Sequence, residues 1–461
     1  MATLFLFHRD LRLYDNVGLN AALAHAKAVV PVFIFTPTQI SPQKNKYFSS
    51  AAVQFMIESL TDLNHQLQNN LNIFYGEPTT VLAQIHRTTP IAHIYTNQDY
   101  TPYATKRDAA LADWCAKQKI SWNSYEDYPL LPIETALLKP GQPYQKFTPF
   151  YNKAKLFDVA RPKGKKTASP HQFIKLKSPH LYDPIHIQKK LTGLPPHPAF
   201  RGGRTNALAR LQHTRNLKDY NIQRNIPSVD GTSRMSAYIK FGCVSVREVY
   251  WFVVDTISPN RENALISELF WRDFYLRITY FFPQVLANPN RALRPKYEAI
   301  PWSKNTEHFK SWATGHTGVP FVDAGMRQLN ATGWMHNRTR MVTAMFLSKN
   351  LLIDWREGER YFATKLIDYD PSSNNGGWQW SASTGIDSQP YFRIFNPYLQ
   401  SQRFDPEAKY IKQWVPELAK FTPKQITSPP GDDNPLPPPI IDVKAAAQHA
   451  IKVYALQSRV V

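Results

Sequence analysis

The run Leu4-Phe-Leu-Phe7 introduces the pattern that decides the fold of the first 130 residues. Continuous apolar runs recur at Val29–Phe35, Asn72–Tyr75 and Ile91–Tyr95. Short apolar runs of this kind are typical of strands that are buried on both faces of a parallel sheet. The first part of the chain is therefore predicted to contain four such strands.

Helix-like segments separate these runs, near residues 17–27, 50–68, 78–87 and 103–118. Alternating strands and helices predict an α/β domain with a parallel, Rossmann-like sheet that is covered by helices on both faces. The segment contains neither a Gly-x-Gly-x-x-Gly motif nor a phosphate-loop lysine. An ordinary dinucleotide or nucleoside triphosphate site is therefore disfavoured.

The pattern changes at about residue 196 to long helical stretches without clear strands, and nine of the eleven tryptophans lie beyond this point. We therefore expect an α/β domain over residues 1–130, a linker over 131–195 and an all-α domain over 196–461. The proline-rich segment Pro423–Pro439 is expected to be extended, and a last helix is expected over about 443–456.

The charge of the chain is concentrated in its second part. The 461 residues include 55 basic and 35 acidic side chains, a formal charge of +20. Residues 1–130 carry ten of each sign, so the remaining 45 basic and 25 acidic side chains carry the whole excess. Such an excess indicates either a solvated basic surface or a polyanionic partner, most often nucleic acid.

Cysteine usage and hydropathy exclude several classes of protein. Cys115 and Cys243 are far apart, which excludes a disulfide scaffold and a cysteine-ligated zinc site and suits a reducing compartment. No apolar run approaches the ~18 residues of a membrane span. The Arg9-Asp10 pair comes too early for the apolar core of a signal peptide. An intracellular protein that does not bind membranes is expected.

The segment Glu262–Phe282 is apolar nearly all round and is predicted to be a buried helix. Its charged residues are Glu268, Arg272, Asp273 and Arg277. Buried charges are costly unless they are paired or contact a ligand. Helical spacing places Glu268, Trp271, Arg272 and Tyr275 on one face, either as a Glu268–Arg272 helix pair or as the polar and aromatic wall of a pocket.

Two further segments combine polar and large apolar side chains. Gly333–Met341 runs into an apolar helix that ends at about 349. Asn337, Arg340 and Met341 form one patch on this helix. His336, taken alone, is interpreted as a structural histidine. The stretch Asp368-Tyr-Asp-Pro-Ser-Ser-Asn-Asn-Gly-Gly-Trp-Gln-Trp380 combines residues that are poor helix formers. We expect it to be a loop in which Gly376 and Gly377 leave room for a ligand.

A fourth segment, Gly231-Thr-Ser-Arg-Met-Ser236, precedes another helical pattern. Thr232 or Ser233 is expected to cap that helix, whose free N–H groups can bind an anion. Most such caps bind nothing, so this signal is weak by itself.

Together these four segments resemble the photolyase/cryptochrome family, and most closely the class I cyclobutane pyrimidine dimer (CPD) photolyases. The resemblance covers nearly the whole chain, from Arg9–Asn16 through Tyr144–Phe150, and is densest over Thr317–Phe404. It includes the runs Trp334–Met341 and Asn374–Trp380.

The resemblance implies that the helical domain binds FAD, folded so that its adenine and isoalloxazine rings lie close together. The phosphates and the ribityl chain would be held by Tyr220, Thr232, Ser233, Arg234, Met235 and Ser236. The rest of the flavin would be lined by Arg272, Asn337, Arg340, Asp368, Asp370 and Asn374. Arg340 would pair with Asp368, and the neutral amide of Asn374 would face flavin N5 and stabilise the reduced ring.

The family pattern also implies a site for UV-damaged DNA, single- or double-stranded. Trp271 and Trp380 would form flat walls against a flipped-out dimer, and Glu268 would bind the pyrimidine edge. Asn337 and Met341 would complete the pocket. Contacts with the DNA backbone or the rim are expected from Arg224, Arg338, Lys349 and Arg393.

The mechanism implied is that of a light-driven carbon–carbon lyase. Reduced FADH⁻ absorbs blue or near-UV light and passes an electron to the dimer, the cyclobutane ring opens, and the electron returns. Glu268 and Asn374 would act at the reaction centre. Trp378, Trp355 and Trp302 match the positions of the family's electron-transfer chain, which reduces oxidised FAD after illumination.

Three alternative functions remain open: a (6-4) photolyase, a cryptochrome photoreceptor, and a flavoprotein that binds nucleic acid without catalysis. Photolyases for the (6-4) lesion carry histidines where this chain has Asn337 and Met341. Cryptochrome photoreceptors of plants and animals replace the amide at Asn374 by Asp or Cys. A flavoprotein that binds nucleic acid without catalysis would not need Glu268, Trp271 and Trp380 together.

The antenna chromophore of the first domain is also left open. Tyr103-Ala104 and Leu286-Ala287 stand where folate-binding relatives carry an Asn-Glu pair and a lysine, and Asn45–Ser50 does not match the deazaflavin pattern clearly. Folate, deazaflavin, another chromophore or none are the alternatives. We further expect a monomer, located in the cytoplasm or at the nucleoid if the source is bacterial.

Overall fold

The computed structural model describes residues 1–164, 169, 171–178, 180–182, 200–287, 289–431 and 436–459. Most of the second half of the expected linker lies outside these residues. Packing divides the chain into two compact units. Unit 1 comprises Met1–Tyr144, Thr148–Asn216 and Ser233–Phe281, and unit 2 comprises Gln145–Phe147, Leu217–Thr232 and Phe282–Val461.

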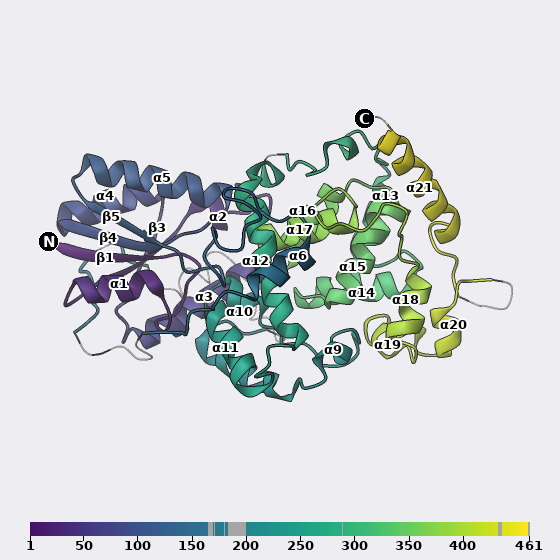
Figure 1. The fold of residues 1–461 in the computed structure, drawn as a ribbon, viewed down its shortest axis with the longest axis horizontal. Coiled ribbons are helices and arrows are strands. Elements are labelled where there is room, and N and C mark those ends of the chain that lie inside the picture. Colours follow the sequence, from purple (N-terminus) through teal and green to yellow (C-terminus); the bar gives the residue numbers. More distant parts are fainter. Residues whose placement is uncertain are drawn as a thin grey trace. The chain divides into compact units, whose positions relative to one another are not determined.

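Unit 1 contains a five-stranded parallel sheet with the order β3-β2-β1-β4-β5 (Figure 1). Its strands are β1 (Ala2–Phe7), β2 (Val30–Phe35), β3 (Asn72–Tyr75), β4 (Ile91–Asn97) and β5 (Ser121–Tyr125). The four predicted strands are confirmed. The pattern missed β5 because this edge strand, Ser-Trp-Asn-Ser-Tyr, is partly exposed and carries no apolar run.

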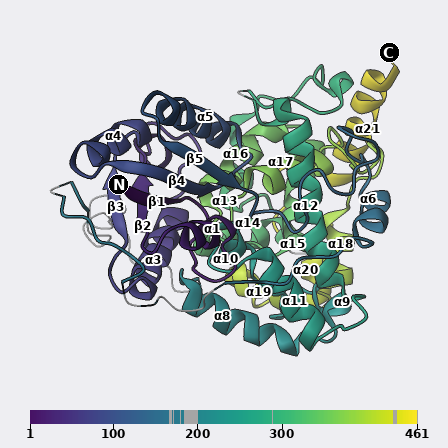
Figure 2. The ribbon, with the colours of Figure 1, turned by 60° about the vertical axis from the view of Figure 1, so that its left-hand side comes forward.

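The predicted helices between the strands are also confirmed. They are α1 (Val17–His25), α3 (Ser50–Gln66), α4 (Pro78–Thr88) and α5 (Pro102–Lys117), with a short α2 (Pro37–Ile40) after β2. Figures 1 and 2 show α4 and α5 on one face of the sheet and α1 and α3 on the other. The expected doubly covered α/β sheet is therefore present.

Unit 1 also includes helical segments that lie far along the chain. They are α6 (Phe147–Ala154, whose first residue belongs to unit 2), α8 (Arg204–His213), η1 (Thr214–Asn216), α10 (Ser236–Lys240), α11 (Val246–Thr256) and α12 (Ala264–Phe281). The compact units thus cross the domain limits expected at residues 130 and 195, which remain a prediction about functional domains.

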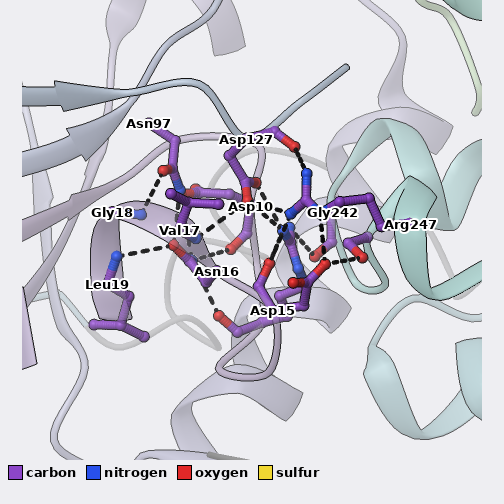
Figure 3. A network of polar contacts seen from close by, with 12 residues as sticks. Asp10, Asp15, Asn16, Val17, Gly18, Leu19, Asn97, Asp127, Gly242 and Arg247 are labelled. Atoms are coloured by element: carbon purple, nitrogen blue, oxygen red, sulfur yellow. Dashed lines mark hydrogen bonds and ion pairs between the residues drawn. The ribbon is translucent and has the colours of Figure 1, made fainter. Parts of the chain in front are cut away.

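A buried polar network joins the sheet to α11 within unit 1 (Figure 3). Arg247 binds the carboxylates of Asp15 and Asp127, at 2.9 Å each. Arg12 donates to both oxygens of Asp127, at 2.8 and 2.7 Å. These arginines and carboxylates compensate one another's charge, which is the condition for burying them.

Among its described residues, unit 2 contains helices joined by turns and loops, and no named strand. Its elements are α9 (Tyr220–Gln223), η2 (Pro283–Leu286), η3 (Pro295–Tyr297), α13 (Thr306–Thr314), α14 (Pro320–Thr332), α15 (Asn337–Met345), the π turn η4 (Phe346–Asn350), α16 (Trp355–Lys365), α17 (Pro371–Ser381), α18 (Pro397–Phe404), α19 (Lys409–Trp414), η5 (Pro416–Leu418), α20 (Pro423–Thr427) and α21 (Val443–Arg459). Its core includes the buried Trp312, Trp355 and Trp378. The last predicted helix is confirmed, and no helix among the described residues is long and apolar enough to span a membrane.

The structure corrects the prediction of a loop over Asp368–Trp380, because Pro371–Ser381 is the helix α17. Asp370 caps this helix by accepting from the N–H of Ser373 at 3.0 Å, and Pro371 occupies the first position, where its missing N–H costs nothing. Burial of Trp378 adds packing energy. Capping and tertiary contacts therefore override the poor helix propensity of the segment.

The expected extended tail also needs a correction over its first residues. Pro423–Thr427 forms α20, which begins with a capping box between Thr422 and Gln425. Of the expected segment Pro423–Pro439, residues 432–435 lie outside the described residues.

Candidate functional site

The amide of Asn374 on α17 is held by Glu359 on α16. Its Nδ2 atom donates to the Oε1 atom of Glu359 at 2.9 Å and to the backbone oxygen of the same residue at 3.1 Å. Glu359 is buried, with 1% of its surface exposed, whereas Asn374 is half-buried. Because only the amide nitrogen can donate to these oxygens, the Oδ1 atom of Asn374 is directed away from Glu359.

Arg340 on α15 forms an ion pair with Asp368. Its Nη2 atom lies 2.9 Å and 3.2 Å from the two carboxylate oxygens, and its Nε atom donates to the backbone oxygen of Met335 at 2.8 Å. The Asp368 side chain is 3% exposed and the Arg340 side chain 26%. The pair expected from the sequence is therefore present, with the guanidinium as its accessible half.

Asn337 and Met341 lie one turn apart on the same helix, as the spacing predicted. The Nδ2 atom of Asn337 lies 3.7 Å from the sulfur of Met341. His336 caps α15, because its Nδ1 atom accepts from the N–H of Arg338 at 3.1 Å. This contact agrees with the interpretation of His336 as a structural histidine.

The described residues leave space beside α17 at Gly377. A Cβ atom added at Gly377 would have none of their atoms within 4 Å, and Gly377 lies three residues after Asn374 and three before Trp380. The Trp380 ring is half-buried and contacts Phe395 at a centroid distance of 6.4 Å. The helix thus brings an amide, a glycine without a neighbour and an aromatic ring onto successive turns.

The three tryptophans of the expected electron-transfer chain all lie in unit 2. Trp355 and Trp378 are buried, and Trp302 packs against Tyr454 at 6.3 Å. Among the described residues, their indole N–H groups have no hydrogen-bond acceptor. Trp312, which contacts Trp378 at 6.0 Å, differs because its indole donates to the backbone oxygen of Thr343 at 3.0 Å.

Unit 1 contributes the residues that were expected on α12. The Trp271 ring lies 5.6 Å from Tyr275, and the Arg272 guanidinium lies 3.7 Å above the ring of Tyr128. Glu268 and Trp271 are half-buried on this helix. The structure therefore places the expected wall of Glu268, Trp271 and Arg272 on one helix.

The other two charges of α12 have a structural role. Asp273 is fully buried and accepts from the N–H groups of Leu130 and Leu131, at 2.9 to 3.1 Å. Arg277 donates to Asp273 at 3.1 Å and to the backbone oxygen of Pro132 at 2.8 Å. These two side chains hold the segment that follows the sheet, so they are not free to bind a ligand.

The residues expected to hold the phosphates divide between the units. Tyr220 and Thr232 belong to unit 2, and 233–236 belong to unit 1. The predicted cap is wrong, because α10 begins at Ser236 after Met235, with no side-chain cap bond. Ser233 accepts from the N–H of Met235 at 3.4 Å instead, and Arg234 adopts a left-handed backbone with φ 51°.

Three arginines of unit 2 lie close together. Arg338 stacks on the ring of Phe404 at 4.0 Å, and Arg403 lies 5.2 Å from the same ring. Burial, together with the positive charges of Arg224 and Arg403, lowers the pKa of Arg338 to about 10. Burial is the larger cause of this shift, and the neighbouring positive charges add to it, so an anion would stabilise the cluster.

Arg393 and Lys349, which were also expected to contact the DNA backbone, lie in different environments. Arg393 is exposed and binds Gln389 at 3.2 Å. Lys349 is fully buried, and its ammonium donates to Ser383 at 2.7 Å and to the backbone oxygen of Tyr391 at 3.2 Å. The expectation that Lys349 contacts a phosphate is therefore wrong, because the π turn η4 directs it into the core, where burial lowers its pKa to about 7.

A separate cluster of polar side chains lies at the carboxyl ends of β1, β2 and β4 in unit 1. Arg9 pairs with Asp99 at 2.8 Å, and the hydroxyl of Tyr103 lies 2.9 Å from that of Thr36. His8 is half-buried, and desolvation holds the pKa of its imidazole well below the usual value. Ligands of open α/β sheets commonly bind at this edge.

Sequence reasoning missed Glu359 and Arg403. Glu359 lies within Asp354–Phe362, one of the runs that resemble the family, where three other charged residues precede it. An acidic side chain on the buried face of an amphipathic helix was the available signal. Nothing local distinguishes Arg403 from other surface arginines.

Comparisons with known proteins agree with this architecture. Residues 3–169 match the family model described as DNA photolyase, and residues 265–456 match the FAD binding domain of DNA photolyase. The chain is 35% identical over 465 residues to the deoxyribodipyrimidine photo-lyase of a Synechococcus species, covering 95% of this chain and 93% of that protein. The corresponding enzyme of Escherichia coli is 34% identical over 478 residues, covering 97% of each chain.

Solved structures of the same class superpose over nearly the whole chain. An archaeal photolyase from Sulfolobus tokodaii, crystallised with two FAD molecules, has a TM-score of 0.88 at 38% identity and covers 99% of this chain and 100% of its own. A cryptochrome from a Synechocystis species has a TM-score of 0.85 at 29% identity and covers 98% of this chain and 99% of its own. The fold and the site define a flavin-binding protein of the photolyase and cryptochrome class. The chain belongs to the DNA photolyase family.

Proposed function

We propose that this chain is a deoxyribodipyrimidine photo-lyase that binds FAD and uses light to split cyclobutane pyrimidine dimers in DNA. Two observations in the family's FAD-binding region carry the proposal together: the amide of Asn374 that Glu359 holds, and the Arg340–Asp368 ion pair. The relatives that carry this enzyme name match over most of the chain.

The residues present fit FAD. The accessible guanidinium of Arg340 and the free Oδ1 atom of Asn374 offer a cation and an acceptor, and no described atom fills the space beside Gly377. The cofactor would be held by Tyr220, Thr232, Ser233, Arg234, Met235, Ser236, Arg272, Asn337, Arg340, Asp368, Asp370 and Asn374. When bound, reduced FAD supplies the electron that light transfers to the dimer and that returns after the ring opens.

The proposed partner is UV-damaged DNA. Trp271 and Trp380 stack on the extruded dimer, Glu268 accepts a hydrogen bond from the pyrimidine edge, and Asn337 and Met341 complete the pocket. Arg224 and Arg393 bind the DNA backbone. The excess of positive charge after residue 130 supports this assignment.

Trp378, Trp355 and Trp302 are proposed to conduct an electron to the cofactor. Oxidation makes an indole N–H group much more acidic, and these indole N–H groups have no acceptor among the described residues. The oxidised ring therefore keeps its proton, and the charge can move on to the next tryptophan.

We further propose that residues 1–130 form an antenna domain, 131–195 a linker, and 196–461 the FAD- and lesion-binding domain. The archaeal relative with two FAD molecules is described as implying a novel light-harvesting cofactor. His8, Arg9 and Tyr103 lie among the polar side chains at the sheet edge, where an antenna chromophore would bind. The protein is proposed to act as an intracellular monomer.

The similarity to the cryptochrome structure supports a blue-light photoreceptor as the second candidate. Light-dependent repair separates the two functions. Purified protein is expected to restore oligonucleotides that contain a CPD under blue light and not in the dark, and to leave (6-4) oligonucleotides unrepaired. Absorption spectra of the released cofactors identify FAD and any antenna, and equal repair in darkness and light would overturn the proposal.

A further inference from the structure

Tyr128 lies between two guanidinium groups of unit 1. The central carbon of the Arg9 guanidinium is 3.7 Å from the centre of its ring, and that of the Arg272 guanidinium is also 3.7 Å away. We propose that Tyr128 is a positioning residue, whose ring stacks on Arg272 and holds its guanidinium ready for an acceptor atom of FAD. This inference rests on the proposed function, since it requires that Arg272 contact FAD.

The two cations occupy opposite faces of the Tyr128 ring. A contact of 3.7 Å to the ring centre is possible only above or below the ring, because the ring's own atoms keep an approach in its plane farther away. Two guanidinium groups at this distance on one face would overlap. Each face of an aromatic ring carries a negative potential, so both contacts are favourable and the ring separates the two positive charges.

The backbone on either side fixes this ring. Tyr128 follows Asp127, whose carboxylate accepts from Arg12 at 2.8 and 2.7 Å. Two residues later, the N–H of Leu130 donates to Asp273 at 2.9 Å. Tyr128 is itself buried, and cation–π contacts are stronger where water is excluded. The ring is therefore a fixed surface on which a guanidinium can be oriented.

Arg272 keeps one donor group for a ligand. Its Nη1 atom lies 3.4 Å from Oδ1 of Asp273, whereas its Nη2 atom is buried and has no hydrogen-bond partner among the described residues. A buried donor without an acceptor costs free energy, which a hydrogen bond to a ligand would recover. The carbonyl, ring nitrogen and phosphate groups of FAD are acceptors of this kind.

Arg277 on the same helix shows how an arginine with a structural role is bound. It donates to the carboxylate of Asp273 at 3.1 Å and to the backbone oxygens of Leu131 and Pro132 at 3.0 and 2.8 Å. Its hydrogen atoms are thus used within the protein. Arg272 is instead held through its flat face, which leaves an N–H edge for an acceptor and reduces the entropy that the side chain loses when FAD binds.

The test varies the electrostatic potential of the ring and keeps its shape. Tyr128→Phe is the reference, and further proteins carry one, two or three fluorine atoms on this phenylalanine, which draw electron density from the ring faces. The Kd for FAD is measured from the rise in flavin fluorescence when the purified flavin-bound protein is diluted. We expect the Kd to rise with each fluorine, by about fivefold in total, the cost of ordering one long side chain.

Two further backgrounds identify the arginine that transmits the effect. In the Arg272→Met background, fluorine is expected to leave the Kd for FAD unchanged. In the Arg9→Met background, the dependence on fluorine is expected to persist. A flat series in the otherwise unchanged protein, or equal slopes with and without Arg272, would overturn the proposal. If Arg272→Met does not fold or binds no FAD, the Arg9→Met series decides, and loss of the dependence there would show that the ring acts through Arg9.

Repair assays on the wild type separate this inference from the proposed function. If the wild type binds FAD and repairs CPDs while the fluorine series is flat, the role of Tyr128 is wrong and the proposed function stands. If the wild type binds no FAD, the proposed function fails and the inference fails with it. If it binds FAD but does not repair, only the enzymatic assignment fails, and the fluorine series still tests Tyr128.

Discussion

The indole of Trp378 lies against the backbone of Gly358, at a distance that leaves no room for a side chain at residue 358. An added Cβ atom would be 2.1 Å from the ring, and real Cβ atoms essentially never approach closer than 3.0 Å. The contact lets α16, which carries Trp355 and Glu359, pack directly on α17, which carries Asn374. The proposed electron path and the proposed flavin contact therefore depend on one glycine.

Gly358→Ala is expected to destabilise the protein by about 1–3 kcal/mol, because overpacking forces the indole of Trp378 to move. The measurement is urea unfolding of the flavin-free protein. Gly377→Ala is the matched control, since a Cβ atom there meets no atom within 4 Å in the part of the chain that the structure describes. It is expected to stabilise the helix by roughly 0.5–1 kcal/mol. Equal effects at the two glycines would contradict the packing argument.

Lys349→Met is expected to raise the free energy of unfolding at pH 7, by on the order of a few kcal/mol. Burial lowers the pKa of Lys349 from 10.5 to about 7, so between these values the unfolded chain binds more protons than the folded one. The free energy of unfolding of the wild type therefore increases as the pH rises through that range. The advantage of the variant should therefore shrink toward pH 10.

Urea titrations of both proteins at several pH values check this prediction. The variant also loses the two hydrogen bonds to Ser383 and Tyr391. Each loss lowers its free energy of unfolding by about 1 kcal/mol and so reduces the expected increase. A difference between wild type and variant that does not change with pH would show that Lys349 is not neutralised in the folded protein.

Trp302→Phe is expected to block photoreduction of oxidised flavin and to spare repair by chemically reduced protein. Trp312→Phe is the control, because Trp312 is also a tryptophan of unit 2 but is more deeply buried than Trp302, bonds to Thr343 and lies outside the proposed chain. The control should lose stability and keep photoreduction. Absorption changes under blue light measure the first step, and loss of both activities in Trp302→Phe would indicate a structural role.

Glu268→Ala is expected to lower the repair yield more than the flavin content, because the side chain is proposed to contact the dimer rather than the cofactor. Glu262→Ala, at an exposed position before the same helix, serves as the control. Flavin absorbance and repaired DNA are measured on the same samples. A variant that loses flavin in proportion to activity would mean that Glu268 supports cofactor binding.

Affinity for damaged DNA is expected to fall with salt, with a log–log slope of about −0.9 per phosphate neutralised. Arg338→Ala and Arg403→Ala should each weaken binding, and each should reduce the slope by about 0.9 if it removes one phosphate contact. Arg161→Ala is the control, because this exposed arginine is paired with Asp255 at 2.7 Å. Filter binding or fluorescence anisotropy across a salt series provides the slopes, and an unchanged slope in both variants would exclude the cluster as a backbone contact.

The sequence by itself determined the elements whose signal is local. Strands buried on both faces require continuous apolar runs, so four of the five strands and the helices between them could be predicted. The charged, apolar helix α12 and the patch of Asn337 and Met341 followed from helical spacing. The resemblance then identified the class, and the family comparisons confirmed it.

Only the tertiary structure decided how the polar groups are used. Helix α17 forms despite poor propensity because the burial of Trp378 adds to the local cap by Asp370, and that burial depends on packing. Lys349 is in the core and Asn374 is bound to Glu359, fifteen residues away. Periodicity shows which residues share a face of one helix, but which donor meets which acceptor depends on contacts between helices that no local pattern encodes.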